Sequence, residues 1–415
     1  MASLLVSWLV FEAGIRFFIQ PSGNSYGKIF DIKLPPFAIL PQEIPWIADR
    51  SASSMDITVD GIELTNGDLW GFYAKDPVLG YEPEKNTRSQ NGWWQSNNIG
   101  ARKRKDTSQE VPEGEVRLLV FGDSFAHGSR LKQEEAWPSV LESDYPQIDV
   151  VGLAVDGYSM AQSYLRYRKI KPELNYDLVA LMFVPQADLW RDINTLRYIG
   201  GGWSEYRIIM PRFVLRDGIL EAVLSPYGDR PPWHKENGPI VSEKLRNHLR
   251  KFDRFYIKEK YESPFILGHT VFYKLLAQRY FTKRQKKIRS TLYNPKGEAL
   301  RVTKSIFRAM NDEVRQEGKR FFLVILPTAL DLKRMARNPR FARKWRRMIS
   351  FLCDETFACL DLTAEFRKVP LPEVDLIYDG YHYGPKINRR IADAIAGYLA
   401  ASVQTSLSLA GDQRH

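Results

Sequence analysis

From about residue 116 onward, short apolar runs alternate with amphipathic stretches. Five runs of aliphatic and β-branched residues, bounded by polar or turn residues, predict buried strands at Val116–Phe121, Asp149–Leu153, Leu178–Val184, Phe321–Ile325 and Phe357–Leu362. Helix-like stretches follow them at Trp137–Asp144, Met160–Ile170, Val302–Glu317, Ala342–Leu352 and Lys386–Ala401. This alternation predicts an α/β fold, a three-layer sandwich with a central parallel sheet of about five strands. The active site of such a sheet lies beyond the carboxyl ends of its strands.

The same pattern divides the chain into parts. Residues 116–405 hold all the predicted strands, and a large insertion at 192–300 follows the third of them. The insertion contains a glycine run, Gly200–Gly202, which is either a hinge beside the active-site mouth or part of an ordinary helical decoration. Residues 19–115 are rich in Pro, Gly, Asn and Ser, which predicts irregular structure with a few strands.

Residues 1–18 form a hydrophobic N-terminal segment, apolar apart from Glu12, Arg16 and a few small residues. A bilayer-spanning helix needs about 20 apolar residues, so this run is slightly short. A signal peptide would have a basic start and a small-residue cleavage site, and neither is clear. We expect a membrane anchor and an extracytoplasmic location, periplasmic or at the cell surface. The alternatives are an amphipathic helix packed on its own domain and a cytoplasmic protein.

The net charge of +11 is concentrated in two segments. Residues 241–290 hold 14 Lys and Arg against 4 Asp and Glu, residues 331–350 hold 8 against 1, and the rest of the chain is slightly acidic. No zinc finger, basic zipper or aromatic RNA-binding signature accompanies them, so we expect no nucleic-acid partner. An anionic membrane surface or polysaccharide suits them better. The basic run 102–105 is most simply a solvated loop.

A candidate nucleophile follows the first predicted strand, in Phe121-Gly122-Asp123-Ser124. A serine at the carboxyl end of a strand lies beside the N-terminus of the next helix, where free N–H groups favour developing negative charge. By itself, Gly-Asp-Ser occurs often by chance. In an ordinary loop the same residues form an Asx turn or a helix cap.

A serine needs a base, and only one of the six histidines has a suggestive context. His382 follows the last predicted strand and immediately precedes the C-terminal helix, and Asp379 stands three residues before it. One short loop can therefore supply a base and the carboxylate that orients it. An isolated Asp-x-x-His would be read as a surface loop or a metal pair. His127, in the serine loop, is expected to line the pocket or cap the helix.

Together, Gly-Asp-Ser and Asp-x-x-His make the chain resemble the SGNH, or GDSL-type, hydrolase superfamily over about residues 116–400. The resemblance implies a flavodoxin-like sheet and a serine esterase with Ser124 as nucleophile, His382 as base and Asp379 as orienting carboxylate. It also implies an oxyanion hole with N–H groups from Ser124 and Gly157. The expected substrate is an acylated, possibly O-acetylated, carbohydrate or lipid, and no metal or organic cofactor is expected. Transfer of the acyl group to a sugar hydroxyl instead of water is the alternative reaction.

One motif departs from the family. An Asn usually follows the third strand, where its amide completes the oxyanion hole, but here Ala187 occupies that position. Losing one oxyanion donor costs about 10²–10³ in rate. Gln186 has the same amide on a longer stem and is the tentative substitute. A catalytically impaired binding protein of the same fold is therefore a further alternative.

Three aromatic residues, Trp190, Trp203 and Tyr206, are candidates for stacking on sugar rings, although core packing is the better expectation for each. Two cysteines, Cys353 and Cys359, are too few for a four-thiolate zinc site. The sequence leaves open whether they pair or stay free.

Overall fold

The computed structural model describes residues 2–21, 25–37, 56–59, 62–65, 72–89, 91–198, 207–226, 243–261, 267–377 and 379–412. The glycine run Gly200–Gly202, predicted as a hinge, lies outside these residues, as do Trp203 and Tyr206. The expectations for these residues therefore stay predictions.

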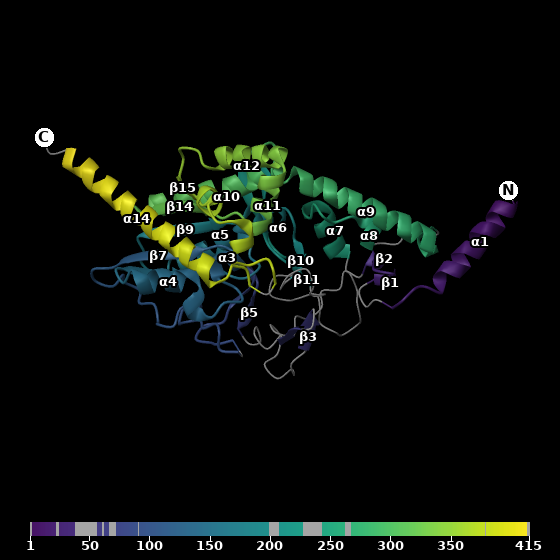
Figure 1. The fold of residues 1–415 in the computed structure, drawn as a ribbon, viewed down its shortest axis with the longest axis horizontal. Helices are drawn as coiled ribbons and strands as arrows, with labels where there is room; N and C mark the ends of the chain where they lie inside the picture. Colours follow the sequence, from purple (N-terminus) through teal and green to yellow (C-terminus); the bar gives the residue numbers. More distant parts are fainter. Residues whose placement is uncertain are drawn as a thin grey trace.

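A five-stranded parallel sheet forms the centre of the molecule (Figure 1). Its strands are β7 (Val116–Phe121), β8 (Ile148–Gly152), β9 (Leu178–Phe183), β14 (Arg320–Ile325) and β15 (Ala358–Asp361), in the order β15-β14-β9-β7-β8. Every boundary lies within one residue of the prediction, and the α/β fold class is confirmed. Because the strand order reverses between β7 and β9, the carboxyl ends of these strands border the crevice where doubly wound folds place their sites.

Helices cover both faces of the sheet. They are α4 (Trp137–Asp144), α5 (Met160–Ile170), α10 (Glu298–Gln316), α12 (Pro339–Leu352) and α14 (Pro385–Asp412). Helices α4 and α14 pack together, and α5 packs on α10. Right-handed crossovers put the first pair on one face and α5, α10 and α12 on the other. Helix α12 begins three residues before its predicted start, because Asn338 caps it by accepting from the N–H groups of Arg340 and Phe341.

Short antiparallel hairpins and further helices make up the rest of the described chain. The hairpin strands are β1 (Ser25–Ile29) with β2 (Ile32–Phe37), β3 (Asp56–Val59) with β4 (Ile62–Thr65), β5 (Tyr73–Asp76) with β6 (Gly80–Pro83), β10 (Leu196–Tyr198) with β11 (Arg207–Ile209), and β12 (Arg212–Arg216) with β13 (Ile219–Val223). The helices are α1 (Ala2–Arg16), α6 (Pro185–Arg191), α7 (Glu243–Phe252), α8 (Lys258–Tyr261), α9 (Val271–Thr291), α11 (Ala329–Arg337) and α13 (Thr363–Phe366). Phe72, Tyr81 and Trp94 belong to the same buried cluster as the sheet, so part of the Pro- and Gly-rich segment shares the main core.

The N-terminal apolar run forms helix α1, whose C-terminal half packs against α9. In the part of the chain that the structure describes, no helix combines the length and the apolar character needed to cross a membrane. Cys353 and Cys359 form a disulfide between the end of α12 and strand β15, with their Cα atoms 5.7 Å apart.

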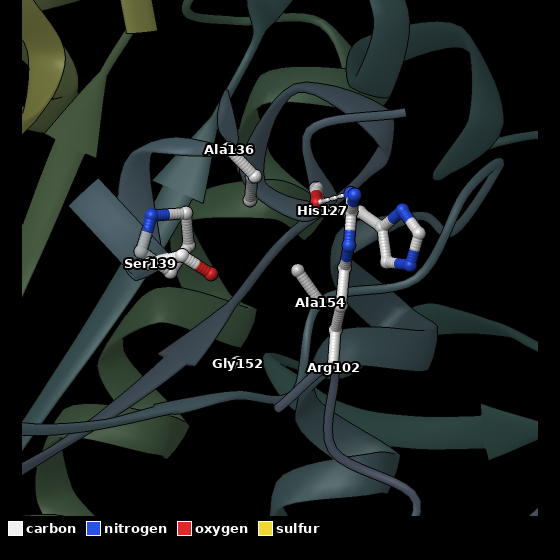
Figure 2. Close-up of a pocket in the computed structure, with 8 residues that line it drawn as sticks. Arg102, His127, Ala136, Ser139, Gly152 and Ala154 are labelled. Atoms are coloured by element: carbon white, nitrogen blue, oxygen red, sulfur yellow. Dashed lines mark hydrogen bonds between the residues drawn. The ribbon is translucent and has the colours of Figure 1, made fainter. Parts of the chain in front are cut away.

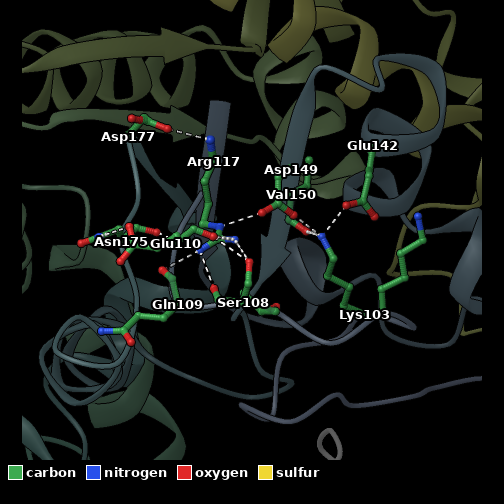
Figure 3. Close-up of polar contacts among 12 residues, drawn as sticks. Lys103, Ser108, Gln109, Glu110, Arg117, Glu142, Asp149, Val150, Asn175 and Asp177 are labelled. Carbon is green, nitrogen blue, oxygen red and sulfur yellow. Dashed lines mark hydrogen bonds and ion pairs between the residues drawn. The ribbon is translucent and has the colours of Figure 1, made fainter. Parts of the chain in front are cut away.

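The amino ends of β7 and β8 carry a buried ionic network (Figure 3). The Arg117 Nε atom lies 2.6 Å from an Asp149 carboxylate oxygen, and the other guanidinium nitrogens donate to the carbonyl groups of Ser108, Glu110 and Asn175. Lys103 joins the network through Asp149 and the Val150 carbonyl. Burial raises the pKa of Asp149, but hydrogen bonds from Lys103 and Arg117 outweigh it and hold that pKa below its usual value.

This network corrects one prediction. The run 102–105 is not a solvated loop throughout, because Arg102 and Lys103 are both buried while Arg104 and Lys105 are exposed. The partners of the two buried cations come from segments 25 to 47 residues farther along the chain. Local sequence therefore carried no sign of their burial.

Replacing Arg117 should measure how much this network contributes to the free energy of unfolding. Arg117→Ala leaves the Asp149 carboxylate with fewer donors and several buried carbonyl groups unpaired, so we expect a loss of about 3–5 kcal/mol in the free energy of unfolding. Urea denaturation followed by tryptophan fluorescence measures the loss.

Arg104→Ala is the matched control. The Arg104 guanidinium pairs with Glu134 at 2.7 Å, but both side chains are more than half exposed. An exposed pair contributes about 0–1 kcal/mol. Equal losses in the two variants would contradict the role given to the buried network.

Candidate active site

A tight turn carries Ser124 from strand β7 into helix α3 (Ser124–His127). Gly122 is required at the turn, since a Cβ atom there would lie 2.7 Å from the Ala126 Cβ and 2.9 Å from the Met182 carbonyl oxygen. Asp123 caps α3 by accepting from the Phe125 N–H at 2.9 Å. The sequence Gly-Asp-Ser thus supplies a glycine for close approach, a helix cap and a hydroxyl at the carboxyl edge of the sheet.

The structure brings the three predicted triad residues together. His382 Nε2 lies 2.8 Å from Ser124 Oγ, and His382 Nδ1 lies 2.5 Å from Asp379 Oδ2. The other Asp379 oxygen accepts from the N–H groups of Tyr381 at 2.8 Å and His382 at 2.9 Å. Ser124 and His382 are 258 residues apart in sequence. One proton path therefore links a hydroxyl, an imidazole and a carboxylate.

Electrostatics keep the carboxylate of this chain ionised. Burial raises the pKa of Asp379, but hydrogen bonds from the His382 side chain and the Tyr381 N–H overcome it and hold the pKa below its usual value. The imidazole packs against two rings, with the Phe125 centroid 4.8 Å away and the Tyr381 centroid 5.1 Å away. The His382 side chain is still 16% exposed, so solvent reaches it.

Gly157, the predicted oxyanion donor, lies in the loop after β8 with a φ of +77°. A Cβ atom there would sit 2.8 Å from the Tyr81 hydroxyl oxygen. That hydroxyl donates to the Asp156 carbonyl, so it cannot move aside freely. Among the described residues, neither the Gly157 N–H nor the Ser124 N–H donates a hydrogen bond. Both groups are thus available to an incoming acceptor.

Ala187 and Gln186 lie on α6, directly after β9. Ala187 is buried, and its methyl group offers no hydrogen bond. The Gln186 amide oxygen lies 2.5 Å from the Thr328 hydroxyl, which is also 2.8 Å from Asp331 Oδ2. One end of the Gln186 amide is therefore held by the loop before α11. Its part in an oxyanion hole stays a prediction.

Sequence reasoning missed Arg191, at the end of α6. Its Nη1 atom lies 3.0 Å from Asp123 Oδ2, 3.1 Å from the Tyr158 carbonyl oxygen and 3.3 Å from Asp188 Oδ1. Asp188 in turn accepts from the Val184 N–H at 2.7 Å. A single guanidinium therefore ties together the loops that follow β7, β8 and β9. The only signal in the sequence was an arginine three residues after an aspartate, which is commonplace in helices.

The two carboxyl groups beside Arg191 are fully buried. Burial raises the pKa of Asp123 and that of Asp188, with a further rise for Asp188 from the charge of Asp123, while Arg191 lowers both. The pKa of Arg191 is itself raised, because the two carboxylates outweigh its burial. The Arg191 cation therefore offsets part of the cost of burying these two carboxyl groups.

A closed pocket lies behind the serine turn and includes neither Ser124 nor His382 (Figure 2). Arg102 and His127 line it, and it has no space for a water molecule. The Arg102 guanidinium donates to the carbonyl groups of His127, Gly128 and Leu131, which secures the C-terminal end of α3. Burial lowers the pKa of Arg102 to about 9. The Arg102 hydrogen bonds beside this pocket thus hold the serine turn in place.

His127 is buried and packs edge-on against Trp94, with ring centroids 4.9 Å apart. Burial and the nearby Arg102 hold its pKa well below the usual value. His127 therefore lines a pocket, but this pocket is not the place where Ser124 and His382 meet. Trp190 packs against Phe255 and the Arg289 guanidinium, which agrees with the expected core role. Over the described ranges, no group of three or more His, Cys, Asp or Glu could hold a metal ion.

Arg191→Met should destabilise the protein in a pH-dependent way. Without the cation, the pKa values of Asp123 and Asp188 rise further, so the folded variant binds protons that the unfolded chain has released. We expect the free energy of unfolding to fall by about 3–5 kcal/mol at about pH 8 and by less at about pH 5, where the carboxyl groups become neutral. Urea denaturation at both pH values measures this.

The double variant Arg191→Met/Asp188→Asn is the control, since it removes the like charge together with the cation. It should recover part of the loss at the higher pH. A loss that is equal at the two pH values would contradict the electrostatic role of Arg191.

No protein-family model and no curated relative match the chain. Among solved structures, it is similar to the psychrotrophic esterase EstA from Pseudoalteromonas sp., with 10% identity, 70% of this chain and 100% of that chain covered, and a TM-score of 0.35. A member of the lipolytic protein G-D-S-L family from Veillonella parvula has 9% identity, coverage of 68% and 97%, and a TM-score of 0.33. An acetylxylan esterase from Geobacillus stearothermophilus, solved as a catalytic mutant, has 12% identity, coverage of 69% and 94%, and a TM-score of 0.33. The solved structures to which this chain is similar thus include lipolytic G-D-S-L proteins and acetylxylan esterases.

Proposed function

We propose that the chain is a serine ester hydrolase in which Ser124 is the nucleophile, His382 the general base and Asp379 the orienting carboxylate. The observation that carries the proposal is the continuous contact from Ser124 Oγ through the His382 ring to Asp379, at 2.8 and 2.5 Å. A serine hydroxyl becomes nucleophilic when a held imidazole accepts its proton. The Asp379 contact leaves His382 Nε2 as the ring nitrogen that faces the serine.

The reaction has two halves. His382 Nε2 takes the Ser124 proton while Oγ attacks the ester carbonyl, and the resulting imidazolium gives that proton to the departing alcohol. His382 then takes a proton from water, the hydroxide attacks the acyl-enzyme, and the proton returns to Ser124 as the acid leaves. Asp379 stabilises the imidazolium in both halves, and its lowered pKa keeps it anionic throughout.

The negative charge on the tetrahedral intermediate needs donors. We assign them to the N–H groups of Ser124 and Gly157, with the Gln186 amide as a third donor. The first two groups make no hydrogen bond to the described residues, so they bind an oxyanion without first breaking a bond. The partial positive charge at the N-terminus of α3 acts in the same direction.

The proposed substrate is an acyl ester, O-acetyl included, of a carbohydrate or lipid outside the cytoplasm at a membrane. The Cys353–Cys359 disulfide supports an extracytoplasmic location, because disulfides persist in oxidising compartments. If a sugar hydroxyl replaces water in the second half-reaction, the same residues perform O-acyl transfer.

A second candidate is a binding protein with little turnover. The observation in its favour is Ala187, which puts a buried methyl group where the resemblance expects an amide. Such a protein would bind its acylated ligand equally well with and without the Ser124 hydroxyl.

A fluorophosphonate probe should label the wild type at Ser124. Ser124→Ala should abolish labelling and aryl-acetate hydrolysis, and Asp379→Asn should slow hydrolysis by about 10⁴ because the imidazole loses its orienting partner. Gel fluorescence and mass spectrometry of the labelled peptide measure the first effect, and steady-state kinetics the second.

Ser129→Ala is a matched control, since Ser129 is another buried serine near the same turn, and its Oγ lies 3.3 Å from the His127 ring. It should keep both labelling and hydrolysis. Absence of labelling in a folded wild type would count against the esterase and in favour of the binding protein.

Ala187→Asn should restore the missing amide. If the third oxyanion donor limits the rate, kcat rises by about 10²–10³ with little change in KM, because the new hydrogen bond forms to the transition state. Ala187→Asp has nearly the same shape but no N–H donor and should give no gain. A folded Ala187→Asn enzyme with unchanged kcat would show that Ala187 does not face the oxyanion.

A further inference from the structure

An uncovered apolar surface extends over three segments remote from the triad. It comprises exposed side chains of α1 and the two residues after it, of the β1–β2 hairpin and of the first half of α9, which we call the apolar face. Its residues are Val6, Leu9, Val10, Phe11, Phe17, Phe18, Phe30, Ile32, Phe272, Leu276 and Tyr280. Phe17 is 89% exposed and Phe30 is 77% exposed. Soluble monomers rarely leave so many large apolar side chains of neighbouring segments open to water.

Specific contacts hold these segments together. The buried Glu12 carboxylate caps α9, accepting from the Val271 N–H at 2.6 Å and from the Phe272 N–H at 3.2 Å. Arg16 donates to the His269 carbonyl at 2.9 Å. Below the surface, Ile29 and Leu34 of the hairpin pack on Val271. The apolar face is therefore a built surface at one end of α9 (Figure 1).

Phe30 combines an unfavourable backbone conformation with an exposed aromatic ring. It stands at the tip of the hairpin with a φ of +50°, in the left-handed region that glycine and asparagine adopt at lower cost. Its ring is mostly exposed, so core packing does not compensate for this strain. A bulky ring kept in an unfavourable backbone conformation at a solvent-facing tip indicates a contact with an apolar partner outside the chain.

The surface next to the apolar face is strongly basic. Helix α9 contains no acidic residue, and it exposes Arg279 and, in its second half, Lys283, Arg284, Lys286, Lys287 and Arg289. Within the described ranges, Lys283, Arg284, Lys286 and Lys287 make no ion pair. Tyr293, just past α9, packs on Phe341 and Trp345 of α12. Helices α11 and α12 continue the basic surface with Lys333, Arg334, Arg337, Arg340, Arg343, Lys344, Arg346 and Arg347, all exposed.

We propose that this combined surface docks the protein on an anionic lipid bilayer. The apolar face enters the boundary between headgroups and acyl chains, and the basic half of α9, continued by α12, lies against the headgroups. Apolar burial and attraction to anionic lipid together determine the affinity of such interfacial elements. A second copy of the chain would bring two basic surfaces together, and a polysaccharide would leave the aliphatic side chains in water. The proposal does not depend on the esterase reaction.

Vesicle flotation tests the proposal with the full chain. Wild type should float with vesicles of phosphatidylcholine mixed with phosphatidylglycerol, and much less with phosphatidylcholine alone or at high salt. Phe30→Asn should reduce binding without lowering the free energy of unfolding, because asparagine suits the positive φ. K283Q/R284Q/K287Q should weaken binding by about 10²-fold, since each basic residue near an anionic leaflet contributes about a fivefold gain in affinity.

The control K105Q/K132Q/K319Q removes the same charge from exposed or half-exposed positions outside this surface and should bind as the wild type does. Ser124→Ala should also float normally, so failure of the esterase proposal would leave this result unchanged. Two outcomes overturn the proposal. One is a wild type that does not float with anionic vesicles, and the other is a dimer in light scattering that Phe30→Asn dissociates, which would show that a second copy covers the apolar face.

Discussion

The buried carboxylate of Asp123 determines how the site is assembled. One of its oxygens fixes the start of α3 through the Phe125 N–H, and the other binds Arg191. Because Arg191 also holds the Tyr158 carbonyl, the serine turn and the glycine loop keep a fixed relation to each other. The proposed oxyanion hole depends on that relation, since its two N–H groups, from Ser124 and Gly157, come from different loops. A charge removed from water at this point is costly by itself and becomes stabilising only through these partners.

The two ends of the sheet use buried charge for different purposes. At the amino end, Arg117 satisfies its donors with Asp149 and backbone carbonyls, and nothing in that network faces the triad. At the carboxyl end, Asp379 and His382 remain partly exposed while Asp123 and Asp188 do not. The amino-end network therefore stabilises the fold, while at the carboxyl end partial exposure leaves Asp379 and His382 accessible to solvent. Parallel strands make this division natural, because all their carboxyl ends meet at one edge.

Sequence pattern predicted the sheet closely because buried strands with both faces covered read as uninterrupted apolar runs. The meeting of Ser124, Asp379 and His382 was also predictable, since Ser124 directly follows a strand and the other two stand in the short loop before the C-terminal helix. Arg191 and Arg102 were not. Their structural roles depend on partners such as Asp123 and the Leu131 carbonyl, which lie 68 and 29 residues away in sequence. Hydrophobic periodicity carries no information about which distant groups will surround a charged side chain, so buried arginines look like surface ones until the fold is known.

Glu12 is another charged residue whose role in the fold the sequence pattern did not reveal. In the sequence it interrupts an apolar run and argues against an apolar helix, but in the fold it caps α9, while Val6, Leu9, Val10 and Phe11 of α1 stay exposed. An acidic residue at a helix N-terminus gains from the free N–H groups there. The charge that makes the segment a poor spanning helix thus fixes its position beside a basic one. The excess of positive charge and the N-terminal hydrophobicity, separate features along the chain, become neighbours because this carboxylate, the Arg16 hydrogen bond and the packing of the hairpin on Val271 join α1 to α9.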